Sequence, residues 1–341
     1  MIGENTMKTL KNLIAAILTL TLVLGLTACG SSSSSETSAE SGGESATYKI
    51  GISQYGEHGS LDNCREGFLE GLAQAGIVEG ENLEVLYENA HFDNQMTTQI
   101  GQTFSAADVD LMVGIATPSA VACYNAAEDK DIPVIFTAIN DPVQAGLDSG
   151  NVTGTSDALP VEAQLQLIRQ LQPEAKTIGI LYTTSEPNSV STIAEYQEKA
   201  PEYGFTIDAV GVTSQAEVTQ AADTLLSHGV DAMSNLTDNN VVGVLPAILE
   251  KANEAGVPIY GSEIEQVKLG CVASAGIDYV QLGKQTGLMA AKVLRGEATC
   301  ADLPYETISE YSIYINSPAL DAMGITVPAD IAEIAVESSA Q

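Results

Sequence analysis

The feature that most constrains the fold of this chain is a regular alternation of short β-rich runs with amphipathic stretches, which begins at Tyr48. The β-rich runs are residues 48–53, 83–88, 111–115, 134–138, 152–156, 177–182, 206–210, 232–235, 258–261 and 271–275. Between them, apolar residues recur at helical spacing in residues 62–75, 93–104, 160–171, 190–202, 216–227, 241–255 and 279–295. Such alternation is typical of parallel sheets with helices on their faces, so an α/β fold is predicted.

The number of predicted strands indicates two lobes rather than one small sheet. The chain has 341 residues and a hydrophobic content of 45%, which is too apolar for general disorder and sufficient for two cores. Chain crossings between lobes are expected at residues 157–160, near residues 275–277 and after Gly296. The predicted domains are a first lobe of residues 47–157 plus 276–298, a second lobe of residues 158–275 plus 299–330 with a late strand at 305–315, and a C-terminal tail of residues 331–341.

The N-terminal segment has the organisation of an export signal. Lys8 and Lys11 precede an apolar run at residues 13–26, which is shorter than the ~20 residues needed to span a bilayer. A transmembrane anchor is the alternative interpretation. Met7 is an alternative start, because Met7-Lys8 begins a conventional signal.

The end of this segment, Leu26-Thr27-Ala28-Cys29, resembles the bacterial lipoprotein signal. That resemblance implies cleavage before Cys29 and attachment of a lipid to its sulfur. Residues 29–46 are rich in Ser, Gly and Glu and cannot bury enough apolar surface to order themselves. We therefore expect a signal peptide at residues 1–28, a flexible tether at residues 29–46, and a body held by lipid at the extracytoplasmic face of the cell membrane.

The balance of charge excludes one large class of partners. The chain has 45 Asp and Glu against 13 Lys and Arg, a formal net charge of -32, and its three arginines are Arg65, Arg169 and Arg295. A protein that binds a phosphate backbone needs a basic face, so no nucleic-acid partner is expected. Tryptophan is absent and 5% of residues are aromatic, which disfavours long stacking grooves for polysaccharide.

The remaining cysteines, Cys64, Cys123, Cys271 and Cys300, lie in separate predicted elements without Cys-x-x-Cys spacing. Neither a metal site nor a redox motif is predicted, and no cofactor is expected. Buried single thiols are the favoured interpretation, and disulfides in an oxidising compartment remain the alternative.

Residues that follow the predicted strands are the candidates for ligand binding, because ligands of parallel sheets bind beyond the carboxyl ends of the strands. These segments are rich in hydroxyls, amides and carboxylates. Thr117, Ser119 and Ser189 lie beside prolines near helix starts, where backbone N–H groups could receive a ligand carboxylate. Ordinary helix capping by these hydroxyls is the alternative.

Carboxylates and tyrosines in the same segments suggest the other ligand groups. Asp157, Glu186, Asp238 and Glu263 could hold a ligand ammonium, although solvated loop carboxylates are common in so acidic a chain. Tyr55, Tyr182 and Tyr279 could pack on a ligand side chain, or simply edge the core.

Known catalytic motifs are absent from the sequence. It contains no Walker-type loop, no Gly-x-Ser-x-Gly and no His-Glu-x-x-His. His228 precedes a glycine at a predicted helix end, where a capping role suffices. His58 and His91 follow strands and could meet, so a secreted α/β enzyme that uses this pair is an alternative, but a binding protein is favoured.

Several spaced motifs resemble those of the TrpX-type ABC transporter substrate-binding lipoproteins over roughly residues 47–320. The motifs are Gln54-Tyr-x-Glu57-His58-x-x-Leu61-Asp62, Ala116-Thr117-Pro-Ser119-Ala120, Phe136-x-Ala-x-x-Asp141-Pro142, Val152-Thr-Gly154-x-Ser156-Asp157 and Gly276-Ile277-Asp278-Tyr279-x-x-Leu282-Gly283-x-x-x-Gly287. The resemblance implies a type I periplasmic-binding-protein fold, with two Rossmann-like lobes and three crossovers. It also implies that the protein is not an enzyme and that it serves an ABC importer.

The resemblance implies that the ligand is an aromatic amino acid held in a cleft between the lobes. It also implies that the protein is a monomer and delivers its ligand to ABC transporter permease subunits. The matching motif positions imply a ligand site made of Gln54, Tyr55, Thr117, Ser119, Asp141 and Asp157 on one side and Tyr182, Glu186, Asn188, Ser189, Asp238 and Asn239 on the other. A sugar, a nucleoside or another small solute is the alternative ligand on the same fold.

Overall fold

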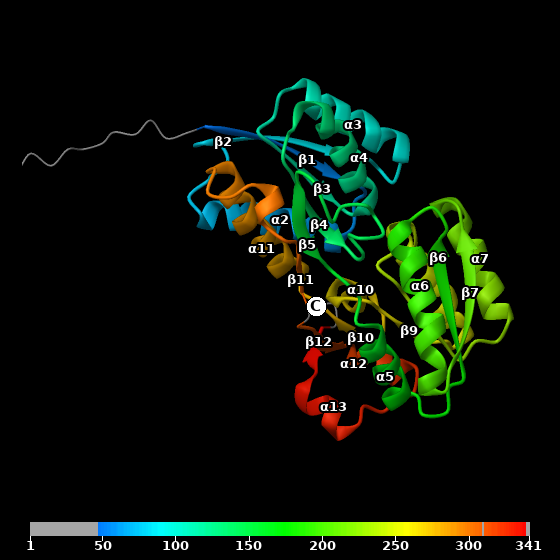
Figure 1. The fold of residues 1–341 in the computed structure, drawn as a ribbon. Coiled ribbons are helices and arrows are strands. Elements are labelled where there is room, and N and C mark those ends of the chain that lie inside the picture. Colours follow the sequence, from blue (N-terminus) through cyan, green and yellow to red (C-terminus); the bar gives the residue numbers. More distant parts are fainter. Residues whose placement is uncertain (1–46, 309, 339–341) are drawn as a thin grey trace, which may run out of the picture. The chain divides into compact units, whose positions relative to one another are not determined.

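The first lobe is built on a six-stranded parallel sheet (Figure 1). The computed structural model describes residues 47–308 and 310–338. The strand order is β11-β5-β4-β3-β1-β2. In chain order the strands are β1 (Tyr48–Gln54), β2 (Leu83–Asn89), β3 (Leu111–Ile115), β4 (Val134–Ile139), β5 (Val152–Ser156) and β11 (Glu306–Thr307).

Helices cover this sheet and close a single hydrophobic core. They are α2 (Gly59–Gln74), α3 (Asn94–Ala106), α4 (Thr117–Ala127) and α11 (Tyr279–Leu294), with short 3-10 turns η1 (Glu128–Lys130) and η3 (Cys300–Asp302). Helix α4 is not among the stretches of helical apolar spacing, although a helix start was predicted beside Pro118. Its residues are mostly small and lack an amphipathic period, and it packs against both α3 and the sheet.

The second lobe contains two sheets. A parallel sheet has the order β7-β6-β8-β9, with β6 (Thr177–Thr183), β7 (Thr206–Val212), β8 (Ala232–Ser234) and β9 (Ile259–Tyr260). The other has the order β10-β12-β13, with β10 (Ala273–Gly276) antiparallel to β12 (Ser312–Ile315) and β13 (Val336–Glu337) parallel to β12. The helical elements are α5 (Val161–Leu171), α6 (Pro187–Lys199), η2 (Ala200–Tyr203), α7 (Gln215–Ser227), α8 (Asn239–Val242), α9 (Leu245–Ala255), α10 (Ile264–Leu269), α12 (Ser317–Ala322) and α13 (Ala329–Ile334).

The chain passes between the lobes three times: between β5 and α5, between β10 and α11, and between β11 and β12. The third crossing lies later than the sequence predicts. Glu306 and Thr307 pair with Thr155 and Ser156 of the first sheet, and Cys300 is part of the first lobe's core. Residues 299–308 therefore belong with the first lobe. The strand predicted at 305–315 is instead two short strands, β11 in the first lobe and β12 in the second.

Helices α2 and α11 pack backbone against backbone in the first lobe. A Cβ atom added at Gly67 or Gly71 would lie 2.1 or 2.3 Å from a carbonyl oxygen of α11. One added at Gly283 or Gly287 would lie 2.2 Å from a carbonyl oxygen of α2. Two pairs of glycines four residues apart thus permit an approach that no other residue allows. The N-terminal ends of both helices reach the site described below.

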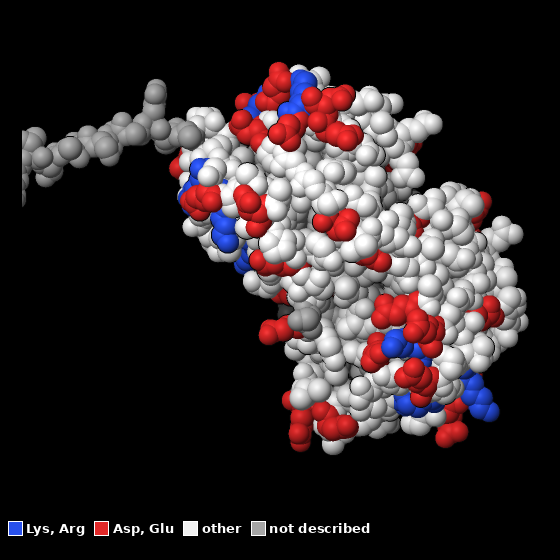
Figure 2. All heavy atoms as spheres, viewed as in Figure 1, with Lys and Arg blue, Asp and Glu red and all other residues white. Residues whose placement is uncertain are grey.

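The excess of acidic residues lies largely at the surface. Figure 2 shows Asp and Glu spread over the visible face, with Lys and Arg among them. Lysines form ion pairs there, including Lys130 with Asp108 at 2.5 Å and Lys199 with Glu162 at 3.0 Å. In the part of the chain that the structure describes, no helix is both long and apolar enough to cross a membrane.

Some predictions concern chain ends. The predicted signal peptide, the tether, Met7 and Cys29 lie outside the described residues. At the other end, the predicted tail at residues 331–341 includes the end of α13 and strand β13, which pairs with β12. Residues 331–337 therefore form part of the second lobe rather than a separate tail.

Candidate functional site

A cavity lies between the two lobes at the ends of several strands. The cavity is small, about 20 Å³, so a ligand larger than a water molecule would require the lobes to move apart. Its lining residues from the first lobe, α11 and the crossing segment are His58, Ser60, Leu61, Ala138, Asn140, Asp157 and Tyr279, and those from the second lobe are Asn188, Thr237, Asn239, Val242, Glu263 and Gln266. Direct hydrogen bonds join the lobes around it, since Asn140 donates to Thr192 at 2.8 Å and Asn63 to Glu265 at 3.0 Å.

Asp157 presents a carboxylate oxygen to this cavity. The residue directly follows β5, where the chain leaves the first lobe, and is only 4% exposed. Its Oδ2 accepts a hydrogen bond from the Tyr279 hydroxyl at 2.6 Å. No residue that the structure describes donates to Oδ1, which is buried. Burial raises the pKa of Asp157 to about 6, and the hydrogen bond from Tyr279 opposes that shift.

His58 presents a ring nitrogen to the same cavity. Its Nε2 lies 3.3 Å from Oδ1 of Asn239 in the second lobe. Because an amide oxygen only accepts hydrogen bonds, Nε2 carries the hydrogen and Nδ1 carries the lone pair. Nδ1 is buried without a partner among residues 47–308 and 310–338. Burial lowers the pKa of His58 to about 4, so the ring is neutral at physiological pH.

Asn188 supplies a third acceptor. Its amide nitrogen donates to the carbonyl of Thr237 at 3.1 Å and lies 3.4 Å from Oε2 of Glu186. Its Oδ1 is therefore turned the other way, and within the described chain it is buried without a hydrogen bond. Asp157, His58 and Asn188 thus leave three unsatisfied acceptors around one cavity, although buried polar atoms normally have partners.

Two long helices also direct their N-termini at the cavity. Helix α2 begins after His58 without a side-chain cap, and its first-turn residues Ser60 and Leu61 line the cavity. Helix α6 likewise begins without a side-chain cap, and its Asn188 lines the cavity. Uncapped first-turn N–H groups and the helix dipole favour an anionic group nearby.

Among the described residues, no Lys or Arg lines the cavity. The second carboxyl group in its wall belongs to Glu263, which caps α10 by accepting from the backbone N–H groups of Glu265 and Gln266 at 2.7 and 2.9 Å. Burial raises the pKa of Glu263 to about 7. Within the described segments, no group of His, Cys, Asp or Glu could hold a metal ion.

Of the first-lobe residues that the resemblance implies, only Asp157 lines this cavity. Gln54 is buried and hydrogen-bonds to Gly56, Asp62 and Arg65. The Tyr55 hydroxyl donates to the carbonyl of Phe92 at 3.2 Å, and the two rings meet edge to face. Ser119 accepts from Ser53, Asp141 caps a turn through the N–H of Gln144, and Thr117 borders a separate hollow with Asn94 and Ser185.

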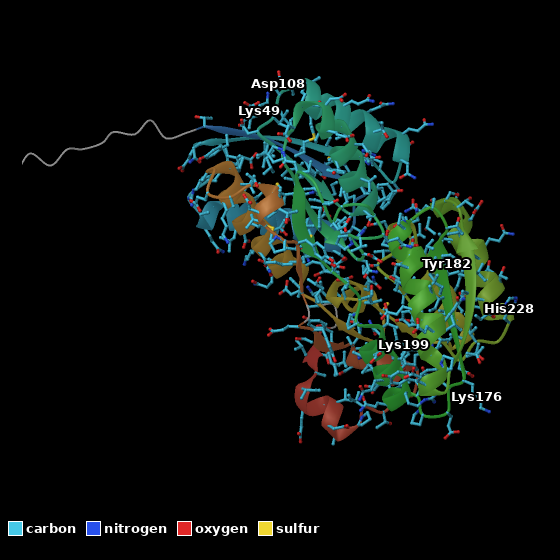
Figure 3. The ribbon with its side chains drawn as sticks, in the orientation of Figure 1. Lys49, Asp108, Lys176, Tyr182, Lys199 and His228 are labelled. Atoms are coloured by element: carbon cyan, nitrogen blue, oxygen red, sulfur yellow. The ribbon has the colours of Figure 1, made fainter. Side chains whose placement is uncertain are left out.

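Of the second-lobe residues that the resemblance implies, Asn188 and Asn239 line the cavity. Tyr182 does not, because its half-buried ring packs over Gly211 of the neighbouring strand β7 (Figure 3). Ser189 and Glu186 also lie outside the lining. The Ser189 hydroxyl donates to Asp238 at 2.6 Å, and Asp238 further accepts from Thr183 and from the N–H of Val241.

The ligand site that the resemblance implies omits most of the cavity wall. The omitted polar residues are His58, Ser60, Asn140, Thr237, Glu263, Gln266 and Tyr279. Several of them follow strands, so strand-end position was a usable signal for His58, Asn140, Thr237 and Glu263. Ser60 and Gln266 gave no such signal, because they enter the wall through the packing of α2 and α10.

The remaining candidate residues, four cysteines and two histidines, do not line the cavity. Cys64, Cys123, Cys271 and Cys300 are buried free thiols, as the favoured interpretation predicts. His91 is exposed, and in the described part of the chain no hydrogen bond joins it to His58. His228 bonds to Asp208 at 2.8 Å at the end of α7, on the outer side of the second lobe (Figure 3).

Comparison with known proteins gives consistent matches. Residues 49–339 match the family described as ABC transporter substrate binding protein. The chain is 38% identical over 324 residues to a tyrosine-binding protein of Clostridioides difficile, covering 93% of this chain and 92% of that one.

Two solved structures of relatives, one with a ligand and one without, are also similar to this chain. An ABC domain from Streptococcus pneumonia in complex with L-Trp is 35% identical with a TM-score of 0.82, covering 86% of this chain and 99% of that one. The ligand-free, open structure of a substrate-binding protein with adhesive properties from Clostridium difficile is 36% identical with a TM-score of 0.65, covering 86% of this chain and 100% of that one. At similar identity and coverage, the TM-score is higher with the ligand-bound relative than with the ligand-free one.

Proposed function

Because this chain belongs to the ABC transporter substrate-binding protein family, we propose that it captures an α-amino acid, with an aromatic side chain, in the cavity between its lobes. The family consists of binding proteins rather than enzymes, so the alternative of catalysis by His58 and His91 is set aside. The relatives named above bind tyrosine and L-Trp, which supports an aromatic ligand.

The observation that carries this proposal is the set of three unsatisfied acceptors around the cavity, namely Asp157 Oδ1, Asn188 Oδ1 and His58 Nδ1. A primary ammonium has three N–H donors and one positive charge. It would satisfy the three acceptors and neutralise Asp157, with charge-assisted hydrogen bonds to that carboxylate. No Lys or Arg of the described residues lines the cavity to compete for the carboxylate.

The other groups of an amino acid have matching surroundings. Its carboxylate would lie at the uncapped N-termini of α2 and α6, in place of the predicted Thr117, Ser119 and Ser189. The side chain would contact the apolar groups of Leu61, Ala138 and Val242.

The cellular setting of the protein is part of the same proposal. Cleavage before Cys29 and lipid attachment to its sulfur would hold the protein, as a monomer, at the extracytoplasmic face of the cell membrane. There it would deliver its ligand to the permease subunits of an ABC importer. Mass spectrometry of the protein purified from membranes should show a lipid on Cys29, and a Cys29→Ser variant should be released from the membrane. An unmodified Cys29 would contradict the anchor.

Calorimetry of the purified protein against the amino acids, sugars and nucleosides tests the ligand class. We expect binding of at least one aromatic amino acid and much weaker binding of its des-amino analogue, because that analogue leaves the three acceptors unpaired. Binding of a sugar or nucleoside with no binding of any amino acid would replace the proposal by the alternative ligand class.

The affinity should also depend on pH. An ammonium binds the ionised form of Asp157, whose pKa in the ligand-free protein is about 6, so binding must displace a proton at lower pH. We expect affinity to fall by up to about tenfold for each pH unit below 6 and to level off above it, as one linked proton requires. Calorimetry across pH 4.5–8 measures this slope. The Asp157→Asn variant is the control, because any slope that it retains belongs to another group such as Glu263.

A further inference from the structure

Glu186 has an environment that neither a ligand contact nor a surface role explains. It lies between β6 and α6, is 1% exposed, and does not line the cavity. Its carboxylate accepts hydrogen bonds almost entirely from asparagines. Oε2 accepts from the backbone and side-chain nitrogens of Asn239 at 3.2 and 2.6 Å, and Oε1 accepts from those of Asn240 at 3.3 and 2.9 Å.

A third asparagine faces the same carboxylate. Nδ2 of Asn188 lies 3.4 Å from Oε2 of Glu186. All three amide groups therefore turn their NH₂ ends toward one buried carboxylate. Since an asparagine amide has a donor end and an acceptor end, this choice also fixes where each carbonyl oxygen points.

Two of the carbonyl oxygens are thereby directed at the cavity and at His58. Oδ1 of Asn188 borders the cavity without a partner among the described residues. Oδ1 of Asn239 bonds to Nε2 of His58 in the opposite lobe. That bond keeps the hydrogen of His58 on Nε2 and leaves Nδ1 as an acceptor toward the cavity.

The neighbouring carboxylate, Asp238, has a different task. It accepts from the N–H and hydroxyl of Thr183, the hydroxyl of Ser189 and the N–H of Val241. Asp238 therefore ties the loop after β6 to the loop after β8, whereas Glu186 orients the amides that those loops carry. Burial and the charge of Asp238 both raise the pKa of Glu186, against the hydrogen bonds from Asn239 and Asn188.

We propose that Glu186 is a positioning residue that sets the hydrogen-bond direction of Asn188 and Asn239, so that acceptors face the ligand ammonium and His58. The inference rests on the proposed function for the ammonium, but the orientation itself is a property of the ligand-free second lobe. It replaces the prediction that Glu186 holds the ammonium directly.

The Glu186→Gln variant tests the orientation. Glutamine keeps the size of the side chain but turns one acceptor end into a donor, so at least one facing asparagine must reverse its amide. We expect the affinity for tyrosine to fall about 10- to 100-fold, while the weak affinity for des-amino tyrosine changes less than about threefold. A merely structural role would lower both affinities by the same factor. Equal losses would therefore overturn the proposal.

Two comparisons sharpen this test. Thr183→Val removes a side-chain hydrogen bond to Asp238 without changing an amide partner, and it should leave the ratio of the two affinities unchanged. In an Asn188→Ala background, Glu186→Gln should reduce tyrosine affinity by a clearly smaller factor than in the parent, since one of the oriented acceptors is already gone. Fully additive losses would contradict the assigned role.

A measurement without ligand separates this inference from the proposed function. With selective ¹⁵N-asparagine labelling, the side-chain NH₂ signals of Asn188 and Asn239 are assigned by their loss in single Asn→Asp variants. In the ligand-free protein we expect both to shift and to exchange with solvent faster when Glu186→Gln is introduced. Unchanged signals would overturn the positioning role whatever the protein binds, whereas failure of the parent to bind any amino acid would overturn only the proposed function.

Discussion

The Asp157→Asn substitution is expected to weaken binding of an aromatic amino acid by roughly 30-fold to several-thousand-fold. Loss of one partner of a buried, hydrogen-bonded charge pair costs about 2–5 kcal/mol, and each 1.4 kcal/mol is a factor of ten in affinity. Asparagine keeps the shape and can still accept from the Tyr279 hydroxyl. It then turns an NH₂ group toward the ammonium, which has only donors and cannot accept a hydrogen bond.

Calorimetry with tyrosine and tryptophan measures this loss, and Asp141→Asn is the matched control. Asp141 follows β4 but caps a turn through Gln144 and does not line the cavity, so its variant should bind within about twofold of the parent. Asp157→Asn should not unfold the protein. Because burial raises the pKa of Asp157, the ionised side chain opposes folding above pH 6, and the variant should be at least as stable at pH 7. Unchanged affinity would exclude Asp157 as the ammonium partner.

The Gly283→Ala substitution is expected to destabilise the protein by about 1–3 kcal/mol, the usual cost of overpacking a tight contact. The added Cβ would lie 2.2 Å from the carbonyl oxygen of Cys64 and 2.8 Å from the backbone nitrogen of Phe68. Both atoms belong to the backbone of α2, so relief requires the helices to move apart. Helix propensity alone predicts the opposite sign, a gain of about 1 kcal/mol for alanine over glycine.

Thermal and denaturant unfolding distinguish these signs. Gln281→Ala is the control, since this position is exposed on the same helix, and we expect no loss of stability there. Ligand affinity should fall as well in Gly283→Ala, because α2 carries Ser60 and Leu61 and α11 carries Tyr279 into the cavity. A Gly283→Ala protein that is more stable than the parent would show that the two helices can separate at no cost.

Much of the fold was predictable because the periodicity of the apolar residues is local information. The run at 111–115 is strand β3 to the residue, and the stretch at 279–295 is α11 within one residue. Predictions failed where tertiary contacts replaced the period. Helix α4, whose small residues pack against α3 and the sheet, shows no amphipathic pattern, and the predicted helix at 241–255 is two helices because α9 restarts at Leu245 with Pro246 in its first turn.

The candidate site was less predictable, and two predicted serines that do not line it show why. Strand-end position brings a residue to the correct edge of a sheet, but its neighbours decide where the side chain points. The hydroxyls of Ser119 and Ser189 have partners in Ser53 and Asp238, so neither faces the cavity. Asp157 faces it because Tyr279, more than a hundred residues later in the chain, bonds to only one of its two oxygens.

The sequence by itself determined the α/β alternation, the two lobes and the resemblance to a family of substrate-binding proteins, since these depend on local period and on motifs of neighbouring residues. Only the tertiary structure decided which polar atoms remain unsatisfied. Hydrogen bonds between distant segments satisfy most of the strand-end groups, and three atoms left without a partner among the described residues, in Asp157, Asn188 and His58, border the cavity proposed as the ligand site. These hydrogen bonds are the reason we propose that Glu186 orients the neighbouring asparagines rather than contacting the ligand.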